Sequence, residues 1–340
     1  MLHHRYRFAV TGCAFLLTLY ACHSRDAHPE PARVRIAVPS SPITYLPIYL
    51  ARELGYYQEQ GLDVTIEDVP GGSKALQAML GGSVDVAASF LENGIELTAE
   101  GRWVQSFVTL LDFPGFVLAV SPASNRKIKT LEDLRGAVIG VTTPGSASHH
   151  FVNYLLLRHG VSPGDVSIAS IGLGPASVAA VERGQIHAGV LTGSGITTVE
   201  RHFPNLIILA DTRTAEGVKQ LFGTEIYPAH DLLAPANWLH DHPVTARKLA
   251  GSVQRATQWM REHSPEEIYS RLPAQYRASD AEADLAALRA TIPMLSRDGT
   301  ISPAGAEAVR KVLAVSSERV RHASIDLAQI YTNEFVTARQ

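Results

Sequence analysis

The chain has 340 residues, a formal net charge of −3 and only two cysteines, Cys13 and Cys22. A slightly acidic chain without a basic cluster is not expected to bind nucleic acid. A body of roughly 300 residues is too long for one small core and predicts two domains of ordinary size.

The first 21 residues have the features of a bacterial secretion signal. Arg5 and Arg7 precede an apolar run at residues 8–20. This run is too short to span a bilayer as a stable helix, and its length is typical of a signal sequence. We therefore interpret residues 1–21 as a signal peptide that is absent from the mature protein.

Leu19-Tyr20-Ala21-Cys22 resembles a lipobox, in which the cysteine is acylated. It predicts an exported protein, periplasmic or at the cell surface, held at a membrane by lipid on Cys22. The alternative is ordinary cleavage near Ala21, with Cys22 incidental. Residues 22–33 are rich in proline and charge and predict a flexible tether. An acylated Cys22 leaves a body without a thiol, which excludes cysteine-based zinc sites, iron–sulfur clusters and thiol nucleophiles.

Strand and helix patterns then alternate along the chain. In the first part, strands are predicted at 33–38, 63–67 and 84–88, and helices at 46–60 and 74–80. The same order returns later, with strands predicted at 137–141, 166–171 and 187–191, and helices at 149–159 and 176–183. This order is typical of a parallel sheet covered by helices on both faces. The sequence therefore predicts two α/β units.

The last hundred residues are predicted to be mainly helical. Helices are expected at 244–261, 265–272, 280–291, 303–313 and 326–335. Ser264 and Ser302 each precede a proline, which predicts a serine N-cap followed by proline at the first helical position. Too few strands remain for a third sheet, so we expect these helices to complete the first unit.

Residues 46–64, from Leu46-Pro-Ile-Tyr to Gly-Leu-Asp-Val64, are similar to the nitrate/sulfonate/taurine branch of ABC-transporter substrate-binding proteins. This branch includes relatives that bind or make the pyrimidine precursor of thiamine. Four further segments agree in the family's order: 72–88, 131–146, 177–191 and 325–335. The resemblance therefore covers nearly the whole chain after the tether.

The resemblance implies an α/β, two-lobed type II periplasmic-binding-protein fold, in which each lobe is a mainly parallel sheet flanked by helices. Lobe 1 would comprise residues 34–120 and 213–340, and lobe 2 residues 121–212. The chain would cross between the lobes near 119–122 and 210–213. With only two crossings, we expect the lobes to close on a ligand by a hinge motion.

The resemblance also implies a function. The chain would be a monomeric binding protein without a cofactor, not an enzyme, that delivers a small organic anion or oxyanion to an ABC permease and ATPase. The ligand could instead be a pyrimidine or another flat heterocycle. The same fold would also suit a sensor or scavenger without a permease, or a thiamine-pyrimidine synthase. The body lacks the cysteines of the iron-binding motif that some of those synthases use.

Ligands of open α/β sheets bind beyond the carboxyl ends of the strands. The loops that follow the predicted strands are rich in hydroxyl groups and glycine. The candidate ligand-binding residues are Ser41, Tyr45, Gly72, Ser73, Ser89, Glu92, Asn93, Asp112, Thr143, Gly145, Ser146, Ser148 and Thr192. Tyr227 is a weaker candidate.

The loop at residues 142–148 is the most informative of these, because it precedes a predicted helix. Free N–H groups and the helix dipole at that position favour an anion, and Gly145 allows close approach of the backbone. Ser146 or Ser148 can instead merely cap the helix, and Ser73 can do the same for the helix that follows it.

Three further features bear on the ligand. An aminopyrimidine is a second possible ligand. The residues compatible with it are the acids Glu92 and Asp112 and, near them, the aromatic residues Phe90, Phe113 and Phe116. The tightest histidine groups, His149-His150 and His240-Asp-His242, lack the spacing of metal ligands, so we interpret them as surface residues. No metal site is predicted.

Overall fold

The computed structural model describes Met1 and residues 32–40, 43–278 and 280–336. The predicted signal peptide and the candidates Cys22 and Ser41 therefore lie outside the described residues. The first strand begins at Ala32, within the range predicted as a tether. No helix in the described part of the chain is long and apolar enough to cross a membrane.

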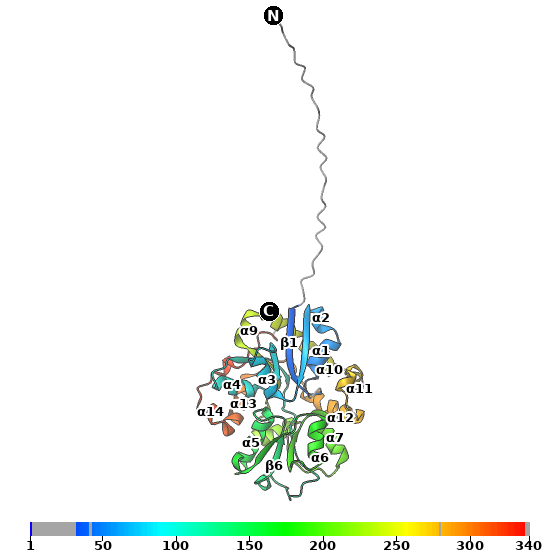
Figure 1. The fold of residues 1–340 in the computed structure, drawn as a ribbon, viewed down its shortest axis with the longest axis vertical. Helices are drawn as coiled ribbons and strands as arrows, with labels where there is room; N and C mark the ends of the chain where they lie inside the picture. Colours follow the sequence, from blue (N-terminus) through cyan, green and yellow to red (C-terminus); the bar gives the residue numbers. More distant parts are fainter. Residues whose placement is uncertain (2–31, 41–42, 279, 337–340) are drawn as a thin grey trace. The chain divides into compact units, whose positions relative to one another are not determined.

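The first sheet has five strands in the order β2-β1-β3-β10-β4. Figure 1 labels β1 of this sheet, with helices beside it. Its strands are β1 (Ala32–Pro39), β2 (Leu62–Val69), β3 (Val86–Ser89), β4 (Val104–Leu111) and β10 (Ala229–Pro235). The first three are parallel, and β10 lies antiparallel between β3 and β4. We call this sheet and the helices on its two faces lobe 1.

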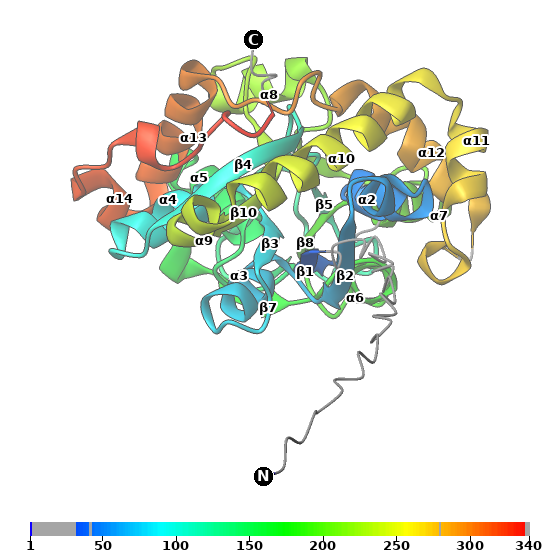
Figure 2. The ribbon, with the colours of Figure 1, turned by 90° about the horizontal axis from the view of Figure 1, so that it is seen from above.

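Side chains alternate between the two faces of this sheet. Ile36 and Val38 pack with the helices α1 (Leu46–Glu53) and α10 (Pro243–Glu262), whereas Ala37 packs with α3 (Gly72–Leu80) on the other face. Figure 2 shows α10 lying across the sheet.

Two helices of lobe 1 differ from the prediction. The single helix predicted at 46–60 is broken at Gly55, which has a φ of 76° and ends α1. The chain restarts as α2 (Tyr56–Glu59). In addition, α4 (Leu91–Ala99) begins within residues 89–93, which the sequence predicts as a loop.

The second sheet also has five strands, in the order β7-β6-β8-β5-β9. They are β5 (Val117–Val120), β6 (Val138–Val141), β7 (Ser167–Ser170), β8 (Ala188–Leu191) and β9 (Ile208–Asp211). The helices of this lobe 2 are α5 (Ala147–Arg158), α6 (Pro175–Glu182) and α7 (Gly193–His202). The boundary predicted at residue 120 assigns β5 to lobe 1, whereas β5 pairs with β8 and β9.

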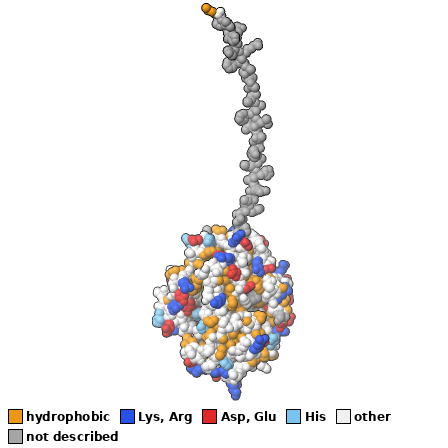
Figure 3. All heavy atoms as spheres, in the orientation of Figure 1, with side chains coloured by type: hydrophobic (Ala, Val, Ile, Leu, Met, Phe, Trp, Pro, Cys, Tyr) orange, Lys and Arg blue, Asp and Glu red, His pale blue; other side chains and the backbone are white. Residues whose placement is uncertain are grey.

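The surface of the body carries charges of both signs. On the face drawn in Figure 3, basic and acidic side chains are interspersed, with hydrophobic side chains scattered between them. Some of the charges form ion pairs, such as the 2.9 Å contact between Arg35 and Asp85. This mixed distribution agrees with the small formal net charge of −3.

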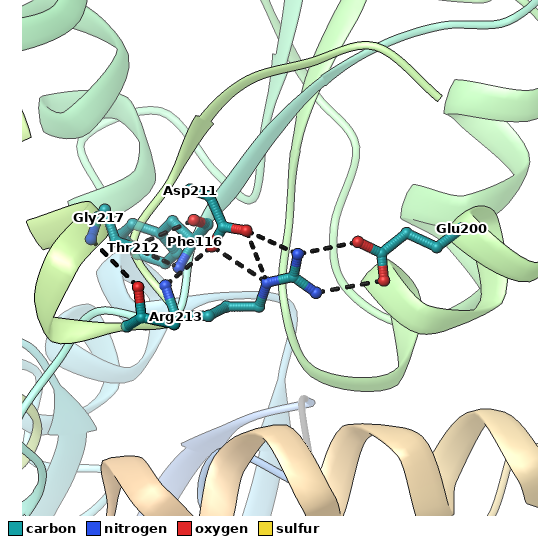
Figure 4. Close-up of polar contacts among 7 residues, drawn as sticks. Phe116, Glu200, Asp211, Thr212, Arg213 and Gly217 are labelled. Carbon is teal, nitrogen blue, oxygen red and sulfur yellow. Dashed lines mark hydrogen bonds and ion pairs between the residues drawn. The ribbon is translucent and has the colours of Figure 1, made fainter. Parts of the chain in front are cut away.

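The chain passes between the two sheets at residues 112–116 and 212–228, and the two crossings are joined by hydrogen bonds (Figure 4). Phe116 N–H donates to the Thr212 hydroxyl over 2.8 Å, and Thr212 N–H donates to the Phe116 carbonyl over 2.9 Å. The Arg213 guanidinium lies 2.6 Å from Asp211 and 2.8 Å from Glu200, which fixes the second crossing to α7. The second crossing also contains α8 (Ala215–Phe222).

The remaining helices are α9 (Ala236–Asp241), α11 (Pro265–Arg271), α12 (Ala281–Thr291), α13 (Pro303–Ser316) and α14 (Glu318–His322). Both predicted serine caps are confirmed. Ser264 forms a capping box with Glu267, and the Ser302 hydroxyl accepts from Gly305 N–H over 3.0 Å.

These helices do more than complete lobe 1. The Thr197 hydroxyl of α7 donates to the Ala283 carbonyl of α12 over 2.7 Å. The buried face of α13 shares an apolar core with α5. Helices that follow lobe 1 in sequence therefore also support lobe 2.

The prediction of a helix at residues 326–335 is wrong. Only Leu327–Gln329 forms a short 3₁₀ turn. The segment instead pairs with the edge of β4, because Ser106 N–H donates to the Ile330 carbonyl and Thr332 N–H donates to the Ser106 carbonyl, both over 2.9 Å. An exposed strand edge offers unpaired N–H and C=O groups. The backbone of this segment forms hydrogen bonds with them, in place of the bonds that it would form within a helix.

Candidate ligand-binding cleft between the lobes

A cavity of about 30 Å³ lies at the carboxyl ends of strands from both sheets. Its described walls are Pro39, Thr44, Tyr45, Gly72, Phe90, Asn93, Phe116, Thr142, Ser146, Ala147, Ser148, Leu173, Thr192 and His230. Six of the residues predicted from the loops meet here: Tyr45, Gly72, Asn93, Ser146, Ser148 and Thr192. None of the described lining residues is a lysine, arginine, aspartate or glutamate.

One wall of the cavity is aromatic. The ring of His230 lies 4.8 Å from that of Tyr45 and 4.4 Å from that of Phe90, measured between centroids. Phe90 stacks on Phe116 at 5.1 Å. All four rings are buried. Tyr45 therefore packs within lobe 1 and also lines the cavity.

Another part of the cavity wall, from lobe 2, is a cluster of three hydroxyl groups. The side chains of Thr142, Ser146 and Ser148 lie 2.9–3.0 Å from one another, and all three are buried. Ser148 also accepts a hydrogen bond from Thr142 N–H over 3.0 Å. Ser146 is the N-cap residue of α5 by position, but its hydroxyl does not cap the helix. Ala147 and Ser148 form the first turn of α5, where N–H groups have no partner within the helix.

Two hydrogen bonds join the lobes beside this cavity. The hydroxyls of Ser73 and Thr143 lie 2.6 Å apart, and Asn93 Nδ2 donates to the Gly145 carbonyl over 3.0 Å. Gly145 has a φ of 76°, a conformation that favours glycine. Ser73 is not the N-cap of its helix, because α3 begins at Gly72 with Gly71 as the cap. The two lobes are therefore in direct contact around the cavity.

Glu92 lies in a second, smaller cavity and not in a solvated loop. It belongs to the first turn of α4 and is only 3 % exposed. Its Oε2 has no hydrogen-bond partner among the described residues, and burial raises the pKa of the carboxyl to about 8. Tyr227 and His150 line the same cavity, where burial lowers the pKa of His150 to about 4. His149 and His150 are both half-buried, whereas the sequence predicts surface residues.

The other candidates have supporting or peripheral positions. The Ser89 hydroxyl donates to Asn93 Oδ1 over 3.2 Å and so orients that amide. Asp112 follows β4, where burial raises the pKa of its carboxyl, but it is not among the described walls of the cavity. His240 and His242 are exposed, as predicted. In the described part of the chain no three histidine, cysteine or acidic residues gather where they could hold a metal.

His230 is the titratable residue of this site that sequence reasoning missed. It lies on β10, a strand that the sequence analysis does not predict. The signal was present, because Pro228 is followed by the largely apolar run of residues 229–234. The apolar run alone does not reveal that β10 inserts between β3 and β4 and brings His230 to the cavity.

Two α/β lobes with two crossings and a cavity between them define the periplasmic-binding-protein fold. The periplasmic aliphatic sulphonate binding protein SsuA of Escherichia coli has this fold, with a TM-score of 0.66 and 18% identity over 90% of this chain and all of that one. A protein of known structure from Bordetella bronchiseptica is 36% identical, with a TM-score of 0.85 over 90% of this chain and 96% of its own. The NMT1/THI5-like family matches residues 43–268, and the chain belongs to that family.

Relatives of this chain differ in the roles that their names give. YtlA of Bacillus subtilis, named as a binding protein, is 24% identical over 285 residues, which cover 82% of this chain and 80% of YtlA. The Saccharomyces cerevisiae 4-amino-5-hydroxymethyl-2-methylpyrimidine phosphate synthase THI13 is 25% identical over 228 residues. That match covers 64% of this chain and 63% of THI13, so it spans less than two thirds of the enzyme.

Proposed function

We propose that this chain is the extracytoplasmic solute-binding component of an ABC importer. The observation that carries the proposal is the cavity at the carboxyl ends of both sheets, enclosed by buried side chains from both lobes. A site divided between two lobes couples ligand binding to lobe closure, and a transporter can recognise the closed form. A sensor or scavenger without a permease would use the same geometry.

The sequence predicts either an anion or a flat, uncharged ring as the ligand. One part of the cavity wall suits the anion, and another part suits the ring. An organic anion or oxyanion would be bound by the first turn of α5, at Ala147 and Ser148, and by the cluster of three hydroxyls. A flat ring would pack on the aromatic wall. The described walls carry no cationic side chain to offset the desolvation of an anion, and this charge balance favours an uncharged ring.

An enzyme of the kind found in yeast is the second candidate, and the sequence match to THI13 is the observation that favours it. Against it, both cysteines of the chain lie at or before residue 22. A synthase also needs an arrangement of reactive groups at its cleft. The described cavity walls offer one histidine and otherwise hydroxyl, amide and apolar groups. We therefore propose a binding protein as the first candidate function and an enzyme as the second.

The export and anchoring of the protein are part of the same proposal. The lipobox-like residues 19–22 and the basic and apolar run before them support secretion and acylation of Cys22. Both features lie outside the described residues. A periplasmic location agrees with that of SsuA, which has the same fold.

A solute screen followed by an uptake measurement tests the proposal. The melting temperature of the purified protein is measured with sulfonates, oxyanions, pyrimidines and other small heterocycles, because a solute that binds only the folded state raises it. Cells with and without the gene are then compared for uptake of each solute that binds. The proposal expects uptake to require the gene. A solute that binds tightly but enters both strains equally would favour the sensor or scavenger, and turnover of the solute would favour the enzyme.

A further inference from the structure

His230 has an unusual backbone conformation for a residue in a strand. Its φ is 59°, and it is the only non-glycine among the described residues with a positive φ. Its side chain is buried at the cavity wall, where it is 2 % exposed. Such backbone strain persists only where the surrounding structure enforces it, and it is concentrated at functional sites.

The hydrogen bonds of the imidazole fix which nitrogen carries the proton. His230 Nε2 lies 3.0 Å from the Pro114 carbonyl oxygen. A carbonyl oxygen only accepts hydrogen bonds, so Nε2 must carry the hydrogen. Burial lowers the pKa of His230 to about 4, so the ring is neutral at physiological pH. Nδ1 is then a bare acceptor, and it has no partner among the described residues although it is buried.

We propose that His230 Nδ1 accepts a hydrogen bond from an N–H or O–H group on an uncharged, planar ligand ring that packs among Tyr45, Phe90 and Phe116. This inference rests on the proposed solute-binding function and specifies the chemistry of the ligand. An unpaired buried acceptor is costly, and a ligand donor removes that cost only when the ligand is bound. A ligand without a donor leaves the cost in place, so Nδ1 discriminates between otherwise similar rings.

The charges around the cavity agree with this ligand class. Burial raises the pKa of the Tyr45 hydroxyl, and the carboxyls of Asp231 and Glu92 raise it further. Burial also raises the pKa of Glu92 to about 8 and that of Asp231 to about 7, so at physiological pH Glu92 is largely neutral and Asp231 is only partly charged. A cavity surrounded mainly by neutral groups suits an uncharged ligand ring better than an anion.

Two matched pairs of ring compounds test the inference. Pyrazole and indazole are neutral and carry one ring N–H, whereas 1-methylpyrazole and 1-methylindazole have the same ring without a donor. Nitrate and methanesulfonate serve as anionic probes. Affinities are measured by ligand-observed NMR titration of the intact protein, with the melting temperature of each variant as the control for folding.

Two substitutions separate the two nitrogens of His230. His230→Gln keeps an amide that can donate to the Pro114 carbonyl, but it provides no acceptor in place of Nδ1. His230→Asn keeps an oxygen near the Nδ1 position and loses the bond to Pro114, and asparagine tolerates a positive φ. We expect the N–H compounds to bind the wild type at least tenfold more tightly than their methylated partners. The preference should disappear in His230→Gln and persist in His230→Asn.

Several results would overturn the inference. They are equal binding within each pair, a preference that survives in His230→Gln, tighter binding of the anions than of either N–H compound, and no binding of either ring pair. The proposed function is judged separately, by whether any solute of the wider screen raises the melting temperature. Tight binding of an anion would therefore contradict the inference and leave the proposed function intact.

Discussion

Asn93 of lobe 1 donates a hydrogen bond from Nδ2 to the backbone carbonyl of Gly145 in lobe 2, over 3.0 Å. The bond links the first turn of α4 to the loop before α5, directly beside the cavity. Asn93 is itself oriented by the Ser89 hydroxyl. Together with the contact between Ser73 and Thr143, this bond joins the two lobes beside the cavity.

The first prediction is that Asn93→Ala favours the open form. Loss of one such hydrogen bond costs about 1 kcal/mol, so ligand affinity should fall by up to tenfold. At an intermediate ligand concentration, small-angle scattering should also show a larger radius of gyration than for the wild type. Gln77→Ala, on the neighbouring α3 and exposed, is the control and should leave both quantities unchanged. Wild-type affinity in Asn93→Ala would show that this bond does not hold the lobes together.

The second prediction concerns the backbone of Gly145. Gly145→Ala should destabilise the protein by about 1 kcal/mol, because φ is positive there, even though the new Cβ would meet no atom within 4 Å. Gly251→Ala is the matched control: it also meets no atom within 4 Å, but it lies inside α10. This control should stabilise the protein by about 0.5–1 kcal/mol. Urea unfolding of both variants checks the opposite signs, and equal effects would contradict the account.

The third prediction is a dependence of stability on pH through Glu92. Burial raises the pKa of its carboxyl from 4.5 to about 8 in the folded protein. Between these values the folded state holds a proton that the unfolded state has lost. The stabilisation from this group is therefore fully present below pH 4.5 and is lost as the pH rises through about 8, with a slope of at most about 1.4 kcal/mol per pH unit.

Glu92→Gln should remove this slope, because the amide resembles the protonated acid. The free energy of unfolding, measured in urea below, within and above the range between the two pKa values, should favour the variant over the wild type increasingly as the pH rises. Glu216→Gln, at an exposed position on α8, is the control and should follow the wild type. A constant difference between wild type and Glu92→Gln across this range would contradict a buried, protonated Glu92.

The fourth prediction tests the bond between the two crossings. Thr212→Val keeps the shape of the side chain but leaves the buried Phe116 N–H without its acceptor, which costs about 1–3 kcal/mol. Thr257→Val is the control, since that buried hydroxyl bonds only to the Val253 carbonyl one turn earlier in α10. We expect the control to cost less than about 1 kcal/mol. Equal melting temperatures for the two variants would show that the crossing bond contributes nothing.

The fifth prediction is that Cys22 carries the membrane anchor. Cys22→Ser should move the protein from the membrane fraction to the soluble fraction of the cells, or block its processing. Fractionation followed by mass spectrometry of the mature chain measures both. Unchanged membrane association together with an unchanged mature mass would refute acylation at this residue.

The two sheets are predictable from the sequence where each strand is followed directly by its crossover helix. Strands β1, β2 and β6 can be placed because their apolar residues and the periodic helices after them are local signals. The hydroxyl-rich loop at 142–148 can be placed at the cavity for the same reason: it follows β6 and precedes α5.

Two of the failures share a physical cause, because they depend on contacts that are distant in sequence. β10 inserts beside β3 although all of lobe 2 lies between them in the chain. No local pattern reports that pairing, and His230 is missed with the strand. The segment at 326–335 is misassigned because its periodicity is helical, whereas its backbone pairs with Ser106 on β4. In both segments, backbone pairing with a strand that is distant in sequence determines the structure and overrides the local preference of the residues.

A crystal structure of the protein with the solute that raises its melting temperature most tests the central claim most directly. Solute density should lie between the lobes, in contact with Tyr45 and His230 on one side and with Ser146 on the other. The contact between Asn93 and Gly145 should be present in the same crystal. Density for the solute at the outer surface of one lobe, with the cavity between the lobes filled only by water, would contradict the account.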